Sequence, residues 1–181
     1  MIGDVVEVRE LTGTEAHTRR PELIELLMDC VEGGASVSFM WPFPSAKAEA
    51  FWRGVAQDVE RGARLLLAAE DADGRICGAV QVVLDQPENQ PHRADLAKML
   101  VHRRARRRGV GAALMQAAEA AAHRAGKGLL VLDTANPDAA RLYERAGWRR
   151  VGVVPGYALT PDGRPCDTTY FYKALAQPSP A

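Results

Sequence analysis

The stretch RRARRRGVGAALMQAAEAAA, residues 103–122, decides how the chain folds. Its five arginines and two glycines lead into an alanine-rich run, which predicts a helix over residues 109–125 with one apolar face. The preceding segment, residues 94–102, predicts a strand. A strand that enters a helix through glycines exposes backbone N–H groups at the positive end of the helix dipole. Beside arginines, such a loop favours an anion, and a diphosphate fits it better than one carboxylate does.

Two other interpretations of the arginine cluster are a nucleic-acid patch and a solvated basic surface. The chain has 23 basic and 23 acidic residues, so its bulk charge does not favour a polyanion, and no nucleic-acid partner is expected. Two common phosphate loops are excluded. The pattern G-x-x-x-x-G-K-[ST] is absent, and a dinucleotide fingerprint starting at Gly109 lacks its third glycine because residue 114 is leucine.

The rest of the 181-residue chain predicts one α/β domain over residues 1–175, followed by a disordered tail at 176–181. We expect one mixed, mostly antiparallel sheet covered by about four helices. The predicted strands are 5–11, 64–71, 75–85, 94–102, 128–135, 148–154 and 168–175. The predicted helices are 21–33, 46–62, 109–125 and 138–147.

Three polar or proline-rich segments are predicted to be loops: 36–45, 86–93 and 155–165. The first, SVSFMWPFPS, contains two phenylalanines, a tryptophan and two prolines, and the prolines prevent a regular element. It is either a plug for the core or the wall of a substrate cavity.

The cysteines and histidines predict neither a disulfide framework nor a metal site. Cys30, Cys77 and Cys166 are odd in number and widely spaced, as expected for thiols in a reducing cytoplasm. The histidines lack the spacing of metal ligands. We also find no signal peptide at the start and no apolar run of the roughly 20 residues that a membrane span needs. A cytoplasmic protein without a membrane partner is therefore expected.

Two segments together resemble the GCN5-related N-acetyltransferase (GNAT) family. RRRGVG, residues 106–111, looks like the family's [Q/R]-x-x-G-x-[G/A] motif, set between the expected strand and helix. LVLDTANPDAARLYERAGWRRVG, residues 130–152, looks like the family's next strand, its Asn-x-x-Ala-x-x-x-Tyr helix and its Gly-aromatic turn. The resemblance extends over nearly the whole chain, is firmest over residues 95–157, and implies a GNAT-like sheet whose central parallel strands splay apart.

Within the family, the chain looks most similar to the tabtoxin-resistance type of acetyltransferase. The similarity lies in ADLAKMLVHRRARRRGVG (94–111), LLVLDT (129–134) and VVPGYALTPDGRPCDTTYFYKAL (153–175). One residue departs from that subgroup: members often lack the family's asparagine, whereas this chain has Asn136.

The resemblance implies acetyl transfer from acetyl-CoA to an amine, with no metal. The pyrophosphate of the donor would lie over the loop and the start of the helix, its pantetheine arm would pair with the preceding strand, and an asparagine would bind the arm near its thiol end. The residues implied for the donor are Met99, Leu100, Val101, Arg106, Arg107, Arg108, Gly109, Val110, Gly111, Ala112, Asn136 and Tyr143. Arg103 and Arg104 are expected to be bystanders.

Three residues are candidates for the chemistry itself. An ammonium cannot attack a thioester, so a carboxylate must accept a proton, directly or through water. Asp95 and Asp133 are the candidates, at equivalent places on neighbouring strands; alternatively, Asp133 caps a helix and Asp95 is a surface charge. Tyr143 matches the family's tyrosine, whose hydroxyl protonates the leaving thiolate, although it could simply pack on a helix face. Neither Cys77 nor Cys166 has a neighbour that activates a thiol, so we expect direct attack in a ternary complex.

The acceptor pocket is expected from the three loops, with Phe39, Trp41, Phe43 and Tyr157 as walls suited to a small amine of some apolar character. The resemblance suggests an amino acid-like compound or an antibiotic as substrate. Acetylation of protein N-terminal amines and non-catalytic binding of acetyl-CoA are the alternatives. Dimers are common among relatives, so the resemblance also suggests a homodimer.

Overall fold

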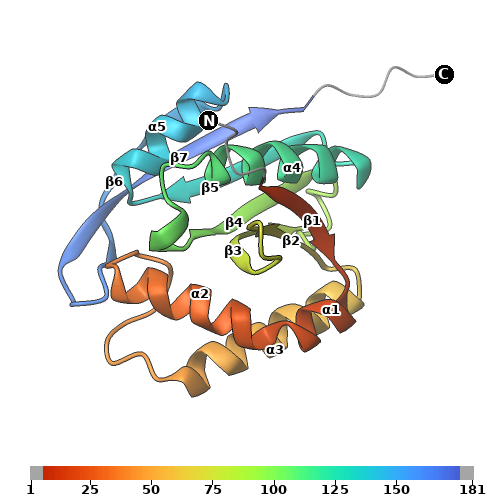
Figure 1. Cartoon of the computed structure of the whole chain (residues 1–181). Helices are drawn as coiled ribbons and strands as arrows, with labels where there is room; N and C mark the ends of the chain where they lie inside the picture. Colours follow the sequence, from red (N-terminus) through yellow and green to blue (C-terminus); the bar gives the residue numbers. More distant parts are fainter. Residues whose placement is uncertain (1–5, 176–181) are drawn as a thin grey trace.

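The computed structural model describes residues 6–175, which form a seven-stranded sheet with helices on both faces (Figure 1). The strand order is β1-β2-β3-β4-β5-β7-β6. The strands are β1 (Glu7–Leu11), β2 (Arg64–Glu70), β3 (Ile76–Val83), β4 (Arg93–Val101), β5 (Leu129–Thr134), β6 (Arg149–Leu159) and β7 (Pro165–Ala174). The helices are α1 (Gly13–Thr18), α2 (Arg20–Glu32), α3 (Ser45–Glu60), α4 (Val110–Arg124) and α5 (Pro137–Arg145), with a 3-10 turn η1 (Arg103–Ala105). The predicted α/β class and mixed sheet are confirmed, and the predicted tail at 176–181 lies outside the described residues.

Two hydrophobic clusters separate the helices onto opposite faces of the sheet. Leu23, Leu27 and Trp52, from α2 and α3, belong to the cluster on one face. Leu114 and Met115, from α4, belong to the cluster on the other face, where α5 also packs. Strand β2 alternates between the two clusters residue by residue, as a strand buried on both faces must.

The only parallel pair in the described sheet, β4 with β5, is short. Residues Arg93–Asp95 pair with Leu129–Val131, and no pairing between the two strands continues beyond Asp95. The edge of β4 from Leu96 to Val101 therefore faces the sheet's opening instead of a neighbouring strand. This is the splay expected of the central strands.

A bulge lies in β4 at the same place. Its register with β3 shifts between Ala79 and Gln81, and Lys98 adopts a left-handed φ of 51°. Leu96 and Leu100 consequently belong to opposite core clusters, although four residues of regular strand would put them on the same face.

The predicted loop at 155–165 is wrong over most of its length. The β6–β7 hairpin extends through Leu159 and resumes at Pro165, leaving a turn at 160–164. Pro155 and Gly156 lie in an irregularity between Val154 and Ala158, where Gly156 takes a φ of 61° and its N–H donates to Asp167 Oδ1 at 2.9 Å. A proline and a glycine thus interrupt the ladder without ending the strand.

Helix α1 was not predicted, and it brings the described α-helices to five rather than four. Its signal is a capping box: the Glu15 N–H donates to Thr12 Oγ1, and the Thr12 N–H donates to Glu15 Oε2. The helix has only six residues, too few for apolar periodicity to reveal it.

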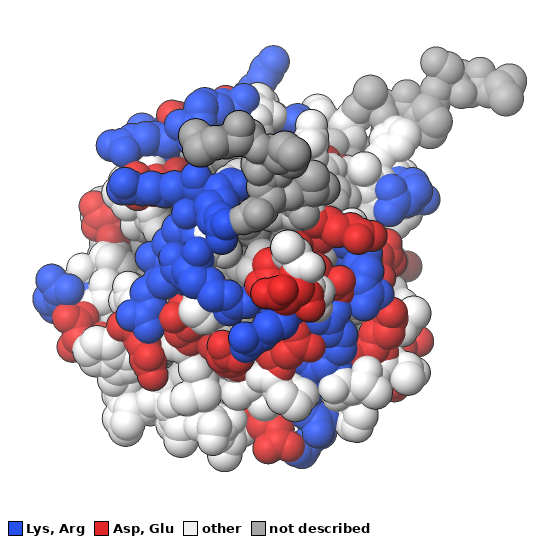
Figure 2. Space-filling view, in the orientation of Figure 1, with Lys and Arg blue, Asp and Glu red and all other residues white. Residues whose placement is uncertain are grey.

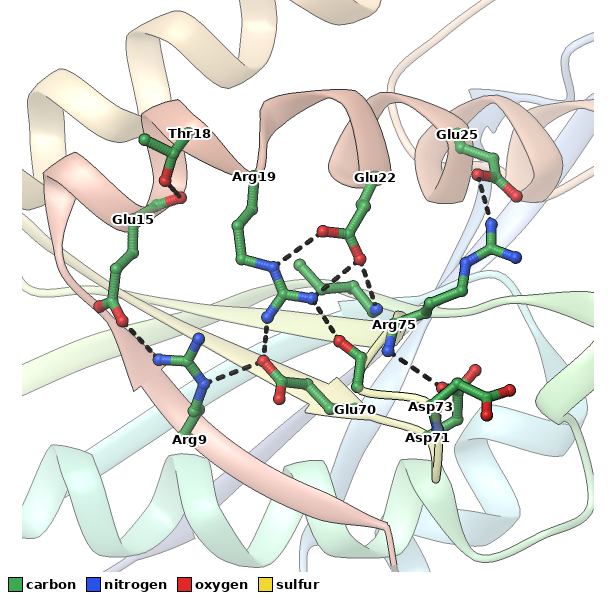
Figure 3. A network of polar contacts seen from close by, with 12 residues as sticks. Arg9, Glu15, Thr18, Arg19, Glu22, Glu25, Glu70, Asp71, Asp73 and Arg75 are labelled. Carbon is green, nitrogen blue, oxygen red and sulfur yellow. Dashed lines mark hydrogen bonds and ion pairs between the residues drawn. The ribbon is translucent and has the colours of Figure 1, made fainter.

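A polar network fastens α1 and α2 to the sheet (Figure 3). Arg19 forms two 2.8 Å hydrogen bonds with Glu22 and also contacts Glu70 of β2. Glu70 accepts a further bond from Arg9 of β1, and Glu22 accepts one from the Ile76 N–H at the start of β3. The hydrogen bonds from Arg19 hold the pKa of Glu22 below its usual value, so the carboxylate remains charged in mild acid.

Gly78 of β3 permits α4 to approach the sheet. A Cβ at this position would lie 2.8 Å from Val110 Cγ1 and 3.1 Å from the Leu100 carbonyl oxygen. Such an overlap forces the helix or the sheet to move, which typically costs about 1–3 kcal/mol.

We predict that Gly78→Ala lowers the free energy of unfolding by about 1–3 kcal/mol, because its methyl group collides with α4. The matched control is Gly54→Ala in α3, where a Cβ would meet nothing within 4 Å. That variant should gain about 0.5–1 kcal/mol from helix propensity. Urea denaturation of both variants measures the difference, and equal stability of the two would contradict the packing argument.

Candidate functional site

A cleft of about 1000 Å³ opens where β4 and β5 separate. Its lining comes from β4, β5, the segment 34–40 after α2, the β6–β7 hairpin and the start of α5. The cleft is bordered by residues from both sides of the sheet, because the splayed strands leave no backbone ladder between the two faces.

The register of the sheet brings the two predicted carboxylates to this cleft. Asp95 pairs with Val131 on the neighbouring strand, and Asp133 follows Val131 by two residues. Residues two apart on a strand share a face, so Asp95 and Asp133 lie on the same side. Both line the cleft, in the arrangement expected from the sequence.

The surroundings of the two carboxylates differ. Asp95 contacts the Arg93 guanidinium, and its Oδ2 accepts a hydrogen bond from Gln86 Nε2 at 3.1 Å. For Asp133, no hydrogen bond or ion pair is found within residues 6–175. Although solvent reaches it from the cleft, desolvation raises the pKa of Asp133; the charge of Asp95 raises it further, and Lys98 opposes both. Asp133 is thus the less neutralised of the two carboxylates.

Tyr143 reaches the cleft from α5. Its ring is 4% exposed and packs against Trp148 and Phe171, with centroids 6.2 and 5.8 Å away. Burial, followed by the charge of Asp133, raises the pKa of Tyr143 far above its usual value, so the phenol remains protonated. No hydrogen bond of its hydroxyl is found in the described part of the chain. Tyr143 is therefore packed in the core and also carries a protonated hydroxyl at the cleft wall.

The loop before α4 turns sharply through two left-handed residues. Arg107 and Gly109 both have left-handed backbones, with φ of 60° and 81°. Gly109 is the N-cap, and no side chain caps the helix. The first turn, from Val110 to Ala112, therefore directs N–H groups outward without a capping side chain.

The five arginines divide into two sets. Arg103 bonds Asp29 through both its N–H and its Nε, each at 2.8 Å, and Arg104 contacts Asp71 at 3.1 Å. All five are exposed, and Arg106, Arg107 and Arg108 lie closest to the turn along the chain. Figure 2 shows basic side chains gathered on the part of the surface that carries this segment, α5 and β6, whereas both charges mix over α1 and α2.

The open edge of β4 carries the other predicted donor-binding residues. Leu100 is 1% exposed and lies in the core, so only its backbone can contact a ligand. Met99 lines the cleft. The Val101 carbonyl accepts a hydrogen bond from Arg106 Nε at 3.4 Å and a contact from the Cys30 thiol at 3.6 Å.

Asn136 is the N-cap of α5 and also lines the cleft. Its Oδ1 accepts from the N–H groups of Asp138 and Ala139, at 2.8 and 3.3 Å. The side-chain amide NH₂ is the remaining group through which Asn136 can contact a bound molecule.

The predicted aromatic wall needs correction at two of its four positions. Phe39 and Tyr157 line the cleft, but Trp41 and Phe43 do not. Phe43 stacks on Phe39 with ring centroids 4.6 Å apart, beside the α2–α3 core. The backbone N–H of Trp41 donates to the Pro161 carbonyl at 2.9 Å, and the Trp41 side chain is half exposed. The segment at residues 36–45 therefore packs against the core through Phe43 and lines the cleft through Phe39.

Two residues of the cleft were missed in the sequence. Lys98 enters it through the β4 bulge, and Tyr170 lies opposite Asp133 in the β5–β7 register. A hydrogen bond with Tyr157 raises the pKa of Tyr170 to about 12. A bulge leaves no readable pattern in a single sequence, and the pairing of β5 with β7 is a long-range contact.

Within residues 6–175, no group of three histidine, cysteine, aspartate or glutamate side chains could hold a metal ion. The helices of this same region are too short or too polar to cross a membrane.

Comparisons with known proteins match this architecture. A protein from *Brucella melitensis* described as a ribosomal-protein-alanine N-acetyltransferase superposes with a TM-score of 0.75 at 22% identity, covering 93% of this chain and 99% of that one. A GCN5-related N-acetyltransferase from *Kribbella flavida* gives 0.77 at 23% identity, with 94% and 98% covered. A phosphinothricin acetyltransferase from *Sinorhizobium meliloti*, solved with AcCoA, gives 0.77 at 16% identity, with 94% and 89% covered.

At these identities the structural likeness establishes the fold. The family itself is established by sequence, since the profile of the acetyltransferase (GNAT) family matches residues 21–148, well over half of the chain. The chain belongs to the GNAT acetyltransferase family.

Proposed function

We propose that the protein transfers an acetyl group from acetyl-CoA to a primary amine of a small molecule, by direct attack in a ternary complex. The observation that carries the proposal is the cleft between β4 and β5, which has a carboxylate of raised pKa, Asp133, and a protonated phenol, Tyr143, on its wall. Family membership supports acetyl transfer, and two carboxylates beside a phenol support an amine as acceptor.

The residues around α4 and β4 fit acetyl-CoA as donor. The uncapped first turn of α4 and the side chains of Arg106, Arg107 and Arg108 suit its pyrophosphate. The unpaired edge of β4 at Met99–Val101 suits the amides of an extended arm, as in strand addition, with the Asn136 amide nearer the thioester. When bound, the thioester supplies the activated acetyl group.

Two side chains would perform the proton transfers. Asp133 accepts a proton from the acceptor ammonium and so exposes the nucleophilic lone pair. Tyr143 donates its proton toward the departing sulfur and lowers the charge that develops there. Asp95, already bound by Arg93 and Gln86, holds the ammonium by its charge.

Phe39 and Tyr157 suit an acceptor with some apolar character. The sequence resemblance to tabtoxin-resistance enzymes supports an amino acid-like compound or antibiotic. The relative from *Brucella melitensis* supports the alternative, a protein N-terminal amine, at 22% identity. Tyr143 at the cleft wall argues against a module that only binds acetyl-CoA.

A homodimer and a cytoplasmic location stay predictions. The edge strand β6 exposes three valines, Val151, Val153 and Val154, which a second copy could cover.

Acetyl-CoA and coenzyme A should each raise the melting temperature, whereas ATP, NAD and short duplex DNA should not. A ligand at 100 times its dissociation constant stabilises the native state by about 2.7 kcal/mol, several degrees for a domain of this size. Arg107→Glu should reduce the shift, and Arg53→Glu, at an exposed position of α3, should not. A shift with DNA alone would identify the arginines as a nucleic-acid clamp and refute the proposal.

Tyr143→Phe should lower kcat about ten- to a hundredfold with little change in the affinity for acetyl-CoA, because only the proton donor is lost. The matched control, Tyr172→Phe, changes a tyrosine of β7 that does not line the cleft and should leave kcat unchanged. Initial rates with calorimetric binding measure both quantities. Tenfold weaker binding with intact turnover would show that Tyr143 holds the donor instead.

Asp133→Asn should remove the acidic limb of the pH–rate profile. A protonated carboxyl cannot accept a proton, so the wild-type rate falls as pH drops through the raised pKa of Asp133. The variant should lose about a hundredfold or more at neutral pH and recover only where the amine is itself neutral. Asp95→Asn should keep the acidic limb. If Asp133→Asn keeps the wild-type pH–rate profile, or if Asp95→Asn loses the acidic limb, then Asp95 is the base.

A further inference from the structure

Lys98 occupies an unusual place in the cleft. It lies in the β4 bulge with a left-handed backbone, a conformation that non-glycine residues adopt rarely. The two residues Lys98 and Met99 fill the register gap opposite one residue of β3. The bulge turns the lysine toward the segment after α2, where its Nζ donates to Ser38 Oγ at 2.9 Å.

The charge of Lys98 has no close partner in the protein. Within residues 6–175, no carboxylate oxygen lies within 4.0 Å of its Nζ. Ser38 satisfies one of the three ammonium donors. A partly buried cation with unsatisfied donors is costly, and desolvation indeed lowers the pKa of Lys98. An anion in the cleft would remove that cost.

The carboxylates of the cleft cannot fill this role directly. Asp95 is already bound by Arg93, and Asp133 lies beyond ion-pair distance of Lys98, though close enough for their charges to interact. Asp133 and Lys98 thus present opposite charges on one cleft, with space between them. A molecule carrying an ammonium and a carboxylate complements that pair.

We propose that Lys98 binds a carboxylate of the acceptor, so that the enzyme prefers amino acids and related zwitterions whose ammonium faces Asp133. This assignment rests on the proposed acetyl transfer and names its substrate class. Lys98 thereby acts as a specificity-determining residue, and it takes no part in the proton transfers. Peptide and protein amines, which lack a carboxylate near the reacting nitrogen, would be disfavoured.

The test compares paired acceptors: a panel of L-amino acids and the α-carboxamide of each, with coenzyme A release as readout. The wild type should favour the acids about ten- to a hundredfold in kcat/KM, mainly through KM, as expected for a charged hydrogen bond. Lys98→Met should erase the preference, with kcat for the amides retained. Lys98→Arg should restore part of it. Lys47→Met, at an exposed lysine of α3, should match the wild type.

Circular dichroism checks the fold, and Lys98→Gln, which can still bond Ser38, replaces the methionine variant if that one does not fold. A preference for acids that survives the loss of Lys98 charge overturns the proposal. The proposal is also overturned if the wild-type enzyme favours the amides, or if it binds acetyl-CoA but acetylates no acid of the panel. Neither result refutes the proposed acetyl transfer. Only the absence of any melting shift with acetyl-CoA refutes the proposed function too.

Discussion

The separation of β4 from β5 after three paired residues is the constraint on which the rest of the molecule depends. Parallel strands ordinarily continue side by side, because each unpaired N–H and C=O costs free energy unless something else binds it. Here β4 leaves its partner at Asp95, and its exposed edge runs toward the first turn of α4. The unpaired backbone of β4 and the uncapped start of α4 are adjacent because β4 leads into α4 through η1 and a short turn.

The same separation decides where the polar groups lie. Behind a continuous sheet, Tyr143 would be an ordinary core aromatic, packed between Trp148 and Phe171. At the opening it remains buried and yet reaches the cleft wall, next to the charge of Asp133. Desolvation at this place raises the pKa of both groups, which keeps the phenol protonated and raises the proton affinity of the carboxylate.

Much of this could be predicted from the sequence. The strand–arginine–glycine–helix order of residues 94–125 predicted an anion-binding turn, the resemblance to the GNAT family implied the splayed sheet, and equivalent positions on neighbouring strands predicted that Asp95 and Asp133 would face one crevice. Apolar periodicity located α2, α3 and α4, whereas Pro137 and Gly147 marked the two ends of α5. Periodicity could not locate α1, whose six residues show only a capping box, nor extend β6 through Pro155 and Gly156, whose local preferences favour a turn.

The sequence by itself determined the alternation of strands and helices, the glycine-lined turn and the residue types available for chemistry, because these follow from local patterns. Only the tertiary structure decided which side chains reach the cleft. Trp41 and Phe43 are as aromatic as Phe39, but neither lines the cleft: Phe43 packs against Phe39 beside the α2–α3 core, and the side chain of Trp41 is half exposed. From the sequence, Lys98 would be taken for a surface lysine. The bulge turns it toward the cleft, and the bulge arises from how β4 pairs with β3, which the residues next to Lys98 do not reveal.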